Sequence, residues 1–426
     1  MILRSLGLER RERVDPIHPK DPALAALFGF GQNTASGVRV DADVAQTSVT
    51  VFACVRVLAE TIGQLPLVLY KRKDGNARER ATKHRLYRIL RQRPNPFQTS
   101  IEWKSMMQGH LALRGNAYSE IISTGGASVA ELMPLHPGRV RPFWVKGKRG
   151  VRAYEYNDPD AGQRVILQDE MFHLMGPPRA DGLCGMSAVE VHRNAIGLDI
   201  AQENQASTLI ANGVAVPGVL KSQKTLSDDG YKNIRTSIDD YMNRGRNAGR
   251  PMILEQGLEW EQMGLSMADA QFLEQRKYSR SQIASLFNVP PHMIGDLERA
   301  TFSNIEHQTL GFVKFTMMPW SIRWEEAISR DLLSESEEDR YFAEFLYDSL
   351  LRGDITARVS AYVKGIQWGW LSVNDVRRLE NMDPIDGADV YLQPSNMIPV
   401  AGTDADEIME KIKELLKGGQ PQPATE

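Results

Sequence analysis

The chain has 426 residues, of which 42% are hydrophobic and 25% charged, as in ordinary globular proteins. Collagen-like, rod-like and wholly disordered chains are thereby excluded, and about two to four domains, or one body with lobes, are expected at roughly 100–200 residues each. The 51 Lys and Arg residues against 54 Asp and Glu residues give a net charge of -3. Proteins that hold nucleic acid by charge alone are usually basic, so this class loses support.

The two cysteines, Cys54 and Cys184, are far apart, which excludes a disulfide framework and a four-cysteine zinc site and suits a reducing compartment. Arg4 interrupts the apolar start of the chain, so we expect no signal peptide. The longest apolar stretch, 49–70, contains charged residues and a proline, so we expect no membrane-spanning helix. These patterns favour a soluble intracellular protein.

Residues 1–46 are first charged and then rich in Pro, Gly, Asn and Ser, which predicts a flexible N-terminal arm. A helix is expected after Thr47 or Ser48, since either side chain can cap it. The segment 65–72 then reads as a short strand. The apolar positions that predict the helix recur at helical spacing: Val51, Val55, Leu58 and Ile62.

A basic run occupies residues 71–93, with only two acidic side chains among ten basic ones. It can be a solvated surface whose aliphatic stems cover apolar neighbours, or a patch that faces phosphates. Tyr87 is its only aromatic residue, and the scarcity of stacking side chains favours the solvated surface.

The next segments alternate in type. Residues 101–113 are expected to be helical, and short apolar runs between Gly and Pro turns predict a small antiparallel sheet over 116–174. A long helix is expected over 188–212, ending at Asn212 and Gly213.

A compact insert follows, with a strand at 216–221 and a helix from Ser227 to about Asn243. Residues 251–263 are expected to form a hairpin, and a second long helix is predicted from Ser266 to Phe287.

The loop at 289–304 joins this helix to the next one. Pro290 and Pro291 stiffen it, and Gly295 allows a bend. We expect the residues between them to project as a small, mostly uncharged tip, although an ordinary interhelical loop is the alternative. The tip consists of His292, Met293 and Ile294.

Pro319 lies in the middle of the following helix and should kink or end it. A strand is then expected within 342–350, followed by two shorter helices, the second capped by Ser372 with Asp375. The tail from residue 402 contains one amphipathic helix and a low-complexity end.

Common enzyme signatures are absent from the sequence: it has no phosphate-binding loop, dinucleotide fingerprint, zinc helix or nucleophile elbow. Glu102 and Lys104 match the Glu-x-Lys form of many nucleases, but a lone match of this kind arises by chance. We interpret Cys54 as a buried inert thiol and His173 as a buried strand residue. No catalytic residue, metal site or cofactor is predicted.

Several segments together resemble the tailed-bacteriophage portal proteins, in the shorter branch found in long-tailed phages and prophages. The resemblance covers about residues 45–400, and the order and spacing of its segments make it specific. They are VFACVRVLAETIGQLPLVLY at 51–70, RPNP at 93–96, LRGNAYSEI at 113–121, ELMPLHPGRV at 131–140, LEQGLEWEQM at 254–263, DAQFLEQRKYSRSQIASLFNVPPHMIGD at 269–296 and FSNIEHQTLGF at 302–312.

The resemblance implies an α+β fold, predominantly helical, with a wing, a two-helix stem, a small α/β clip and a helical crown. The boundaries that it implies are a wing at 47–187 with a spine helix and strand at 305–351, stem helices at 188–212 and 265–288, a clip at 213–264, a tunnel loop at 289–304, a crown at 352–401 and a C-terminal tail at 402–426.

The resemblance also implies a function. Such proteins form a homo-oligomeric ring, typically of twelve subunits, at one capsid vertex, and double-stranded DNA passes through it during packaging and ejection. The expected partners are the large terminase subunit, the head-tail adaptor, and the major capsid and scaffold proteins, with no membrane and no ATP hydrolysis by the ring itself. The ring would assemble in the host cytoplasm and remain in the virion.

Two sets of site residues follow from this anatomy. The tunnel loop would meet DNA through Pro290, Pro291, His292, Met293 and Ile294. The charged clip would dock terminase and then the adaptor through Asp228, Asp229, Asp239, Asp240, Arg244 and Arg246. Two alternatives stay open: another ring-forming or scaffolding capsid protein without DNA passage, and a metal-dependent DNA-processing enzyme that uses Glu102.

Overall fold

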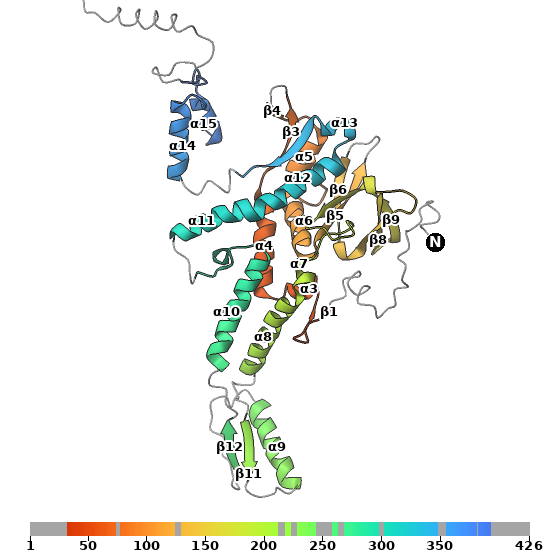
Figure 1. Cartoon of the computed structure of the whole chain (residues 1–426), viewed down its shortest axis with the longest axis vertical. Coiled ribbons are helices and arrows are strands. Elements are labelled where there is room, and N and C mark those ends of the chain that lie inside the picture. The colour runs from red at the N-terminus through yellow and green to blue at the C-terminus, as the bar shows by residue number, and fades with distance from the viewer. Residues whose placement is uncertain are drawn as a thin grey trace, which may run out of the picture. The chain divides into compact units, whose positions relative to one another are not determined.

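The computed structural model of the chain describes residues 32–73, 77–123, 129–211, 218–222, 228–243, 258–262, 268–297, 302–347, 355–380 and 382–392. The chain folds as two units, Met1–Leu346 and Tyr347–Glu426. Figure 1 shows the elements of both units.

The first described segment corrects the expectation of a flexible arm over 1–46, because residues 32–46 are folded. β1 (Gln32–Asn33) pairs with β2 (Arg39–Val40), and α3 (Ala42–Ala45) follows with Asp41 as its cap. The Ala35 amide donates to the Asn194 side chain at 3.3 Å, and Val40 is buried. The composition of the segment hides this packing, because the buried residues are small or few: Thr34, Val40, Ala42 and Ala45. Residues 1–31 lie outside the described residues.

Two antiparallel helices form the centre of the first unit. α4 (Val49–Gln64) starts at the Ser48 cap and buries the apolar face that its spacing predicts. α6 (Ser100–Arg114) packs against it so closely at Gly63 that an added Cβ would lie 2.1 Å from the Ser105 hydroxyl. Trp103 of α6 is fully buried, with the Phe172 ring stacked on it and the Trp324 ring packed against it edge-to-face.

Three three-stranded antiparallel sheets accompany this helical pair, with strand orders β13-β3-β4, β10-β5-β6 and β7-β8-β9. The last two confirm the antiparallel sheet expected over 116–174, divided into two. α5 and two 3-10 turns lie between the strands. The bounds are β3 Leu67–Arg72, β4 Arg78–Arg80, α5 Arg85–Arg91, β5 Asn116–Ser123, β6 Val129–Leu135, η2 Pro137–Arg139, β7 Val140–Trp144, β8 Arg152–Asp158, β9 Gly162–Leu167, η3 Gln168–Glu170, β10 Met171–Met175 and β13 Tyr341–Phe345.

Two long helices, α8 (Arg193–Ala211) and α10 (Ala268–Leu286), lie side by side (Figure 1). A short helix, α7 (Ala188–Val191), precedes α8 and is separated from it at His192, so the single helix expected from residue 188 is broken there.

Between these helices the chain forms β11 (Gly218–Ser222), α9 (Asp228–Asn243) and β12 (Leu258–Gln262). β12 pairs antiparallel with β11, while the first half of the hairpin expected over 251–263 lies outside the described residues, so that hairpin stays a prediction. Local alternation predicts a strand but does not identify its partner.

A long helical run closes the first unit. α11 (Phe302–Phe312) continues through one π turn, η5 (Val313–Met317), into α12 (Met318–Leu332), and α13 (Glu335–Glu338) leads to β13. The π turn comes directly before Pro319, as expected for a proline that lacks a backbone N–H.

The second unit contains α14 (Ile355–Gln367) and α15 (Val373–Leu379). Ser372 and Asp375 form the capping box that the sequence predicts. Arg358 and Tyr362 both bond the Glu380 carboxylate, which ties α14 to the end of α15.

Candidate functional site

Glu102 and Lys104, the two residues that match the nuclease form, lie in different environments. The Glu102 carboxylate accepts from the backbone and hydroxyl of Thr99 in a capping box, and this bonding lowers its pKa. Lys104 is instead buried, with its ammonium donating to the Leu65 carbonyl. Because the two side chains serve different local bonds, they do not form a catalytic pair.

Two other reactive groups are structural. His173 is fully buried between the Tyr154 hydroxyl (3.2 Å) and the Asn116 side chain (3.1 Å), and burial holds its pKa well below the ordinary value. Burial also raises the pKa of Cys54 to about 12, so its thiol stays protonated. Both interpretations made from the sequence are confirmed.

Among the described residues, no His, Cys, Asp and Glu side chains gather in a group of three that could hold a metal ion. Nor does any helix in that part of the chain combine the length and apolar character needed to cross a membrane.

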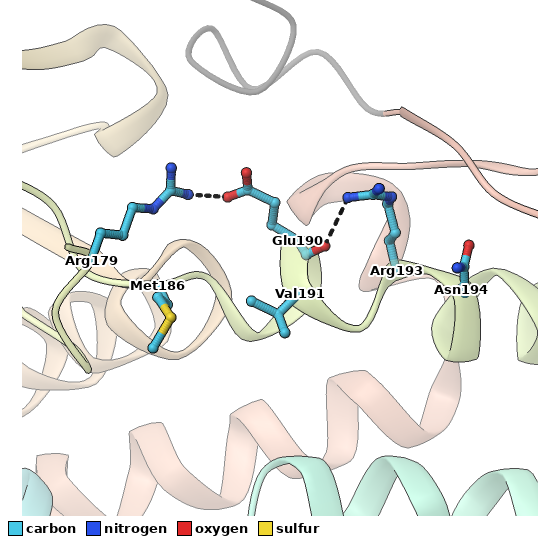
Figure 2. Close-up of a pocket in the computed structure, with 6 residues that line it drawn as sticks. All are labelled: Arg179, Met186, Glu190, Val191, Arg193 and Asn194. Carbon is cyan, nitrogen blue, oxygen red and sulfur yellow. Dashed lines mark hydrogen bonds and ion pairs between the residues drawn. The ribbon is translucent and has the colours of Figure 1, made fainter. Parts of the chain in front are cut away.

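A shallow hollow at the α7–α8 junction holds the charged residues shown in Figure 2. The Arg179 guanidinium pairs with the Glu190 carboxylate, and Arg193 donates to the Glu190 carbonyl at 3.3 Å. The cations are engaged by Glu190, so the hollow offers a structural brace and no anion site.

The start of the basic run lies against aromatic rings. Arg72 covers Phe342 at 5.4 Å, and Arg78 covers Tyr70 at 4.8 Å while pairing with Glu344. Such contacts support the solvated-surface interpretation of this part.

The loop after α10 begins with a specific helix end. Asn288 has φ 52, in the left-handed region, and is the only non-glycine residue with a positive φ among the described residues. Its side chain donates to the Phe315 carbonyl at 3.3 Å, and the Thr316 hydroxyl donates to the Asn288 carbonyl at 2.7 Å. Phe315 lies four residues before Pro319, so its carbonyl is the one that the proline leaves without a helical N–H. Asn288 therefore connects the end of α10 to the π turn.

Pro291–Ile294 form a 3-10 turn, η4, that ends at Gly295 with φ 83. This turn packs on α4 and α10, and the described residues of the expected tip are half-buried. His292 bonds the Gln308 side chain at 2.9 Å, which closes the base of the loop. Pro291 is exposed, and so is Leu297 (62%), the last described residue before the gap at 298–301. The expected DNA contact of Pro290 to Ile294 stays a prediction.

The clip residues are placed only in part. Asp228, Asp229, Asp239 and Asp240 lie on α9, and Asp229 is exposed. Arg244 and Arg246 lie outside the described residues.

Comparison with known proteins identifies the family. The model of the family described as phage portal protein matches residues 49–381. The chain belongs to the phage portal protein family. It is 32% identical over 356 residues to the portal protein of Enterobacteria phage HK97, covering 82% of each chain. It is also 30% identical over 390 residues to the probable portal protein of Streptomyces phage phiC31, covering 89% of this chain and 84% of that one.

Solved structures share the fold. A chain from the neck of a native gene transfer agent particle, computed with C12 symmetry, has a TM-score of 0.53 at 21% identity and covers 90% of this chain and 99% of itself. The crystal structure of an HK97-family portal protein from Corynebacterium diphtheriae has a TM-score of 0.53 at 16% identity, over 73% and 98% of the two chains. The portal-type α+β fold implied by the sequence resemblance is confirmed.

Two features of this portal family member were missed from the sequence. The burial of Lys104 gives no signal, because a lysine on a helix normally faces solvent. The helix end at Asn288 gives a weak one, since Asn can adopt the left-handed conformation that ends many helices.

Proposed function

We propose that copies of this chain assemble into a closed ring, typically of twelve, at one vertex of a phage head, and that double-stranded DNA moves through its centre. The observation that carries this proposal is the portal family match over 49–381. The C12 symmetry of the neck that contains a chain of the same fold supports the subunit number.

The net charge supports passage of DNA. In a ring of about twelve subunits each inward lysine would add about +12, and every neutralised phosphate releases counterions and strengthens binding. A chain with net charge -3 allows DNA to slide, whereas a basic chain would hold it.

We place the DNA-facing part of the tunnel loop beyond its base, around Leu297. His292, Met293 and Ile294 hold the loop against α4 and α10 and set its direction. An exposed apolar residue contacts a duplex without strong phosphate bonds, so the duplex can move past it.

The acidic helix α9 would serve as the docking surface for the terminase and later for the head-tail adaptor. Charges at the rim of an interface mainly set the association rate and its salt dependence. The ring itself would hydrolyse no ATP, would assemble in the host cytoplasm, and would contact capsid and scaffold proteins in the virion.

Electron microscopy of the purified protein tests the proposal. Top views should show closed rings with a central hole, and maps of the particle should show DNA density through that hole. A ring without DNA density in filled particles would favour a scaffold function. Metal-dependent DNA cleavage that is lost in Glu102→Gln would favour the enzyme alternative.

A further inference from the structure

The outer side of the α11–η5–α12 run exposes four large apolar side chains. Phe315 is 66% exposed, Leu310 51%, Ile322 50% and Met318 42%. Phe315, Met318 and Ile322 follow at the i, i+3, i+7 spacing of one helix face. Leu310 precedes Phe315 by five residues, the step that one π turn spans. These four residues therefore form one apolar stripe.

The opposite side of the run is firmly packed. Phe312 and Met317 are buried and also lie five residues apart across η5. Trp324 and Ile328 continue this buried face on α12, which contacts β10 and β13. The stripe is thus presented by a helix whose other side is anchored in the core.

The chemistry of the stripe favours a protein partner. Its members are all uncharged, whereas DNA contacts are made mainly by cationic and polar side chains. Lys314 and Glu326 are exposed on the same helical run, which adds polar residues to its surface. Contiguous exposed apolar patches with polar rims mark protein interfaces.

We propose that the apolar stripe packs against a neighbouring copy of this chain and is one of the two different surfaces that a head-to-tail ring requires. The inference rests on the proposed ring. It is supported by the fold shared with a chain from a C12-symmetric neck, since a closed ring of one chain needs such a surface on every copy.

The test compares Phe315→Glu/Ile322→Glu with Leu167→Glu by mass photometry. Leu167 is an exposed apolar residue at the end of β9, outside the stripe, so the same chemical change serves as the control. The double variant should remain a folded monomer or need at least about ten-fold more protein to assemble, while the control forms rings like the wild type. Rings of the double variant at wild-type concentration would overturn the proposal.

A second measurement tests the proposal even if the double variant fails to fold. A photo-crosslinking p-benzoylphenylalanine at position 315, in an otherwise unchanged chain, should join two copies under ring-forming conditions. Intact rings without a crosslink between copies would contradict the stripe but leave the ring standing. A wild-type chain that forms no ring at all would instead contradict the proposed function.

Discussion

Two groups with displaced pKa values, the buried Lys104 and the half-buried Glu325, lie around one residue of β13. The Lys104 ammonium lies 5.9 Å from the centre of the Phe345 ring, and the Glu325 carboxylate accepts from the Phe345 amide at 2.8 Å. Burial lowers the pKa of Lys104 to about 7 and raises the pKa of Glu325 to about 7. The core beneath β3 and β13 therefore contains charges that change near neutral pH.

Lys104→Met should remove the pH dependence of the free energy of unfolding that Lys104 causes above about pH 7. Between pH 7 and the ordinary lysine pKa of 10.5, the unfolded chain holds a proton that the folded chain lacks. The free energy of unfolding of the wild type should therefore rise with pH there, by up to about 1.4 kcal/mol per unit. Urea unfolding at pH 7, 8 and 9 checks this, and equal slopes in variant and wild type would contradict it.

Glu325→Gln should change how the free energy of unfolding depends on pH between about 4.5 and 7. The raised pKa means that the folded chain keeps a proton between the ordinary value of 4.5 and about 7, so wild-type stability falls as pH rises through this window. In the same urea series, the free energy of unfolding of the variant should not decrease over this pH range. A decrease as large as that of the wild type would show that another group causes it.

Asn288 should tolerate glycine better than alanine. Alanine loses the bond to the Phe315 carbonyl and also strains the left-handed backbone, by about 1–2 kcal/mol, whereas glycine loses only the bond. Thermal unfolding of both variants should rank alanine below glycine. The reverse order would contradict the strain argument.

At the scale of elements, the sequence predicts the local conformation of the tunnel loop but not its contacts with distant helices. Pro290, Pro291 and Gly295 predict a stiff loop with a bend, and both features are present. The contact of η4 with α4 was not predictable, because it depends on a helix more than 200 residues earlier in the chain. Likewise Pro319 predicts a disturbed helix, but not the π turn that Asn288 and Thr316 hold.

Met293→Lys and Leu297→Lys should therefore differ. The half-buried Met293 faces desolvation if charged, so its variant should lower thermal stability and ring yield. Leu297 is exposed, so its variant should form normal rings but package DNA slowly, with relief at higher salt. A packaging assay with purified motor and ring preparations checks this. Full packaging by Leu297→Lys rings at low salt would contradict the DNA-facing assignment.

The clip makes a separate prediction. Asp239→Lys/Asp240→Lys on α9 should weaken terminase binding at low salt while rings still form. Pull-down with the terminase large subunit measures the loss, and Glu203→Lys on α8 is a single acid-to-lysine reversal outside the clip that serves as the control. Equal binding by both variants would remove α9 from the docking surface.

At the scale of the whole molecule, the sequence predicts the fold through many weak signals in order. The predicted capping residues Ser48 and Ser372 are found in their caps, and the antiparallel sheets lie where alternation places them. Pairings between distant strands, such as β3 with β13, were beyond local patterns. The contacts that hold a ring together are also beyond local patterns, since they join separate chains.

The central claim is that this chain forms a portal ring, and counting subunits in top views by electron microscopy tests it most directly. We expect closed rings of about twelve subunits around an open channel, with a mass many times the 47.8 kDa of one chain. A uniformly monomeric protein at micromolar concentration, across low and high salt, would contradict it.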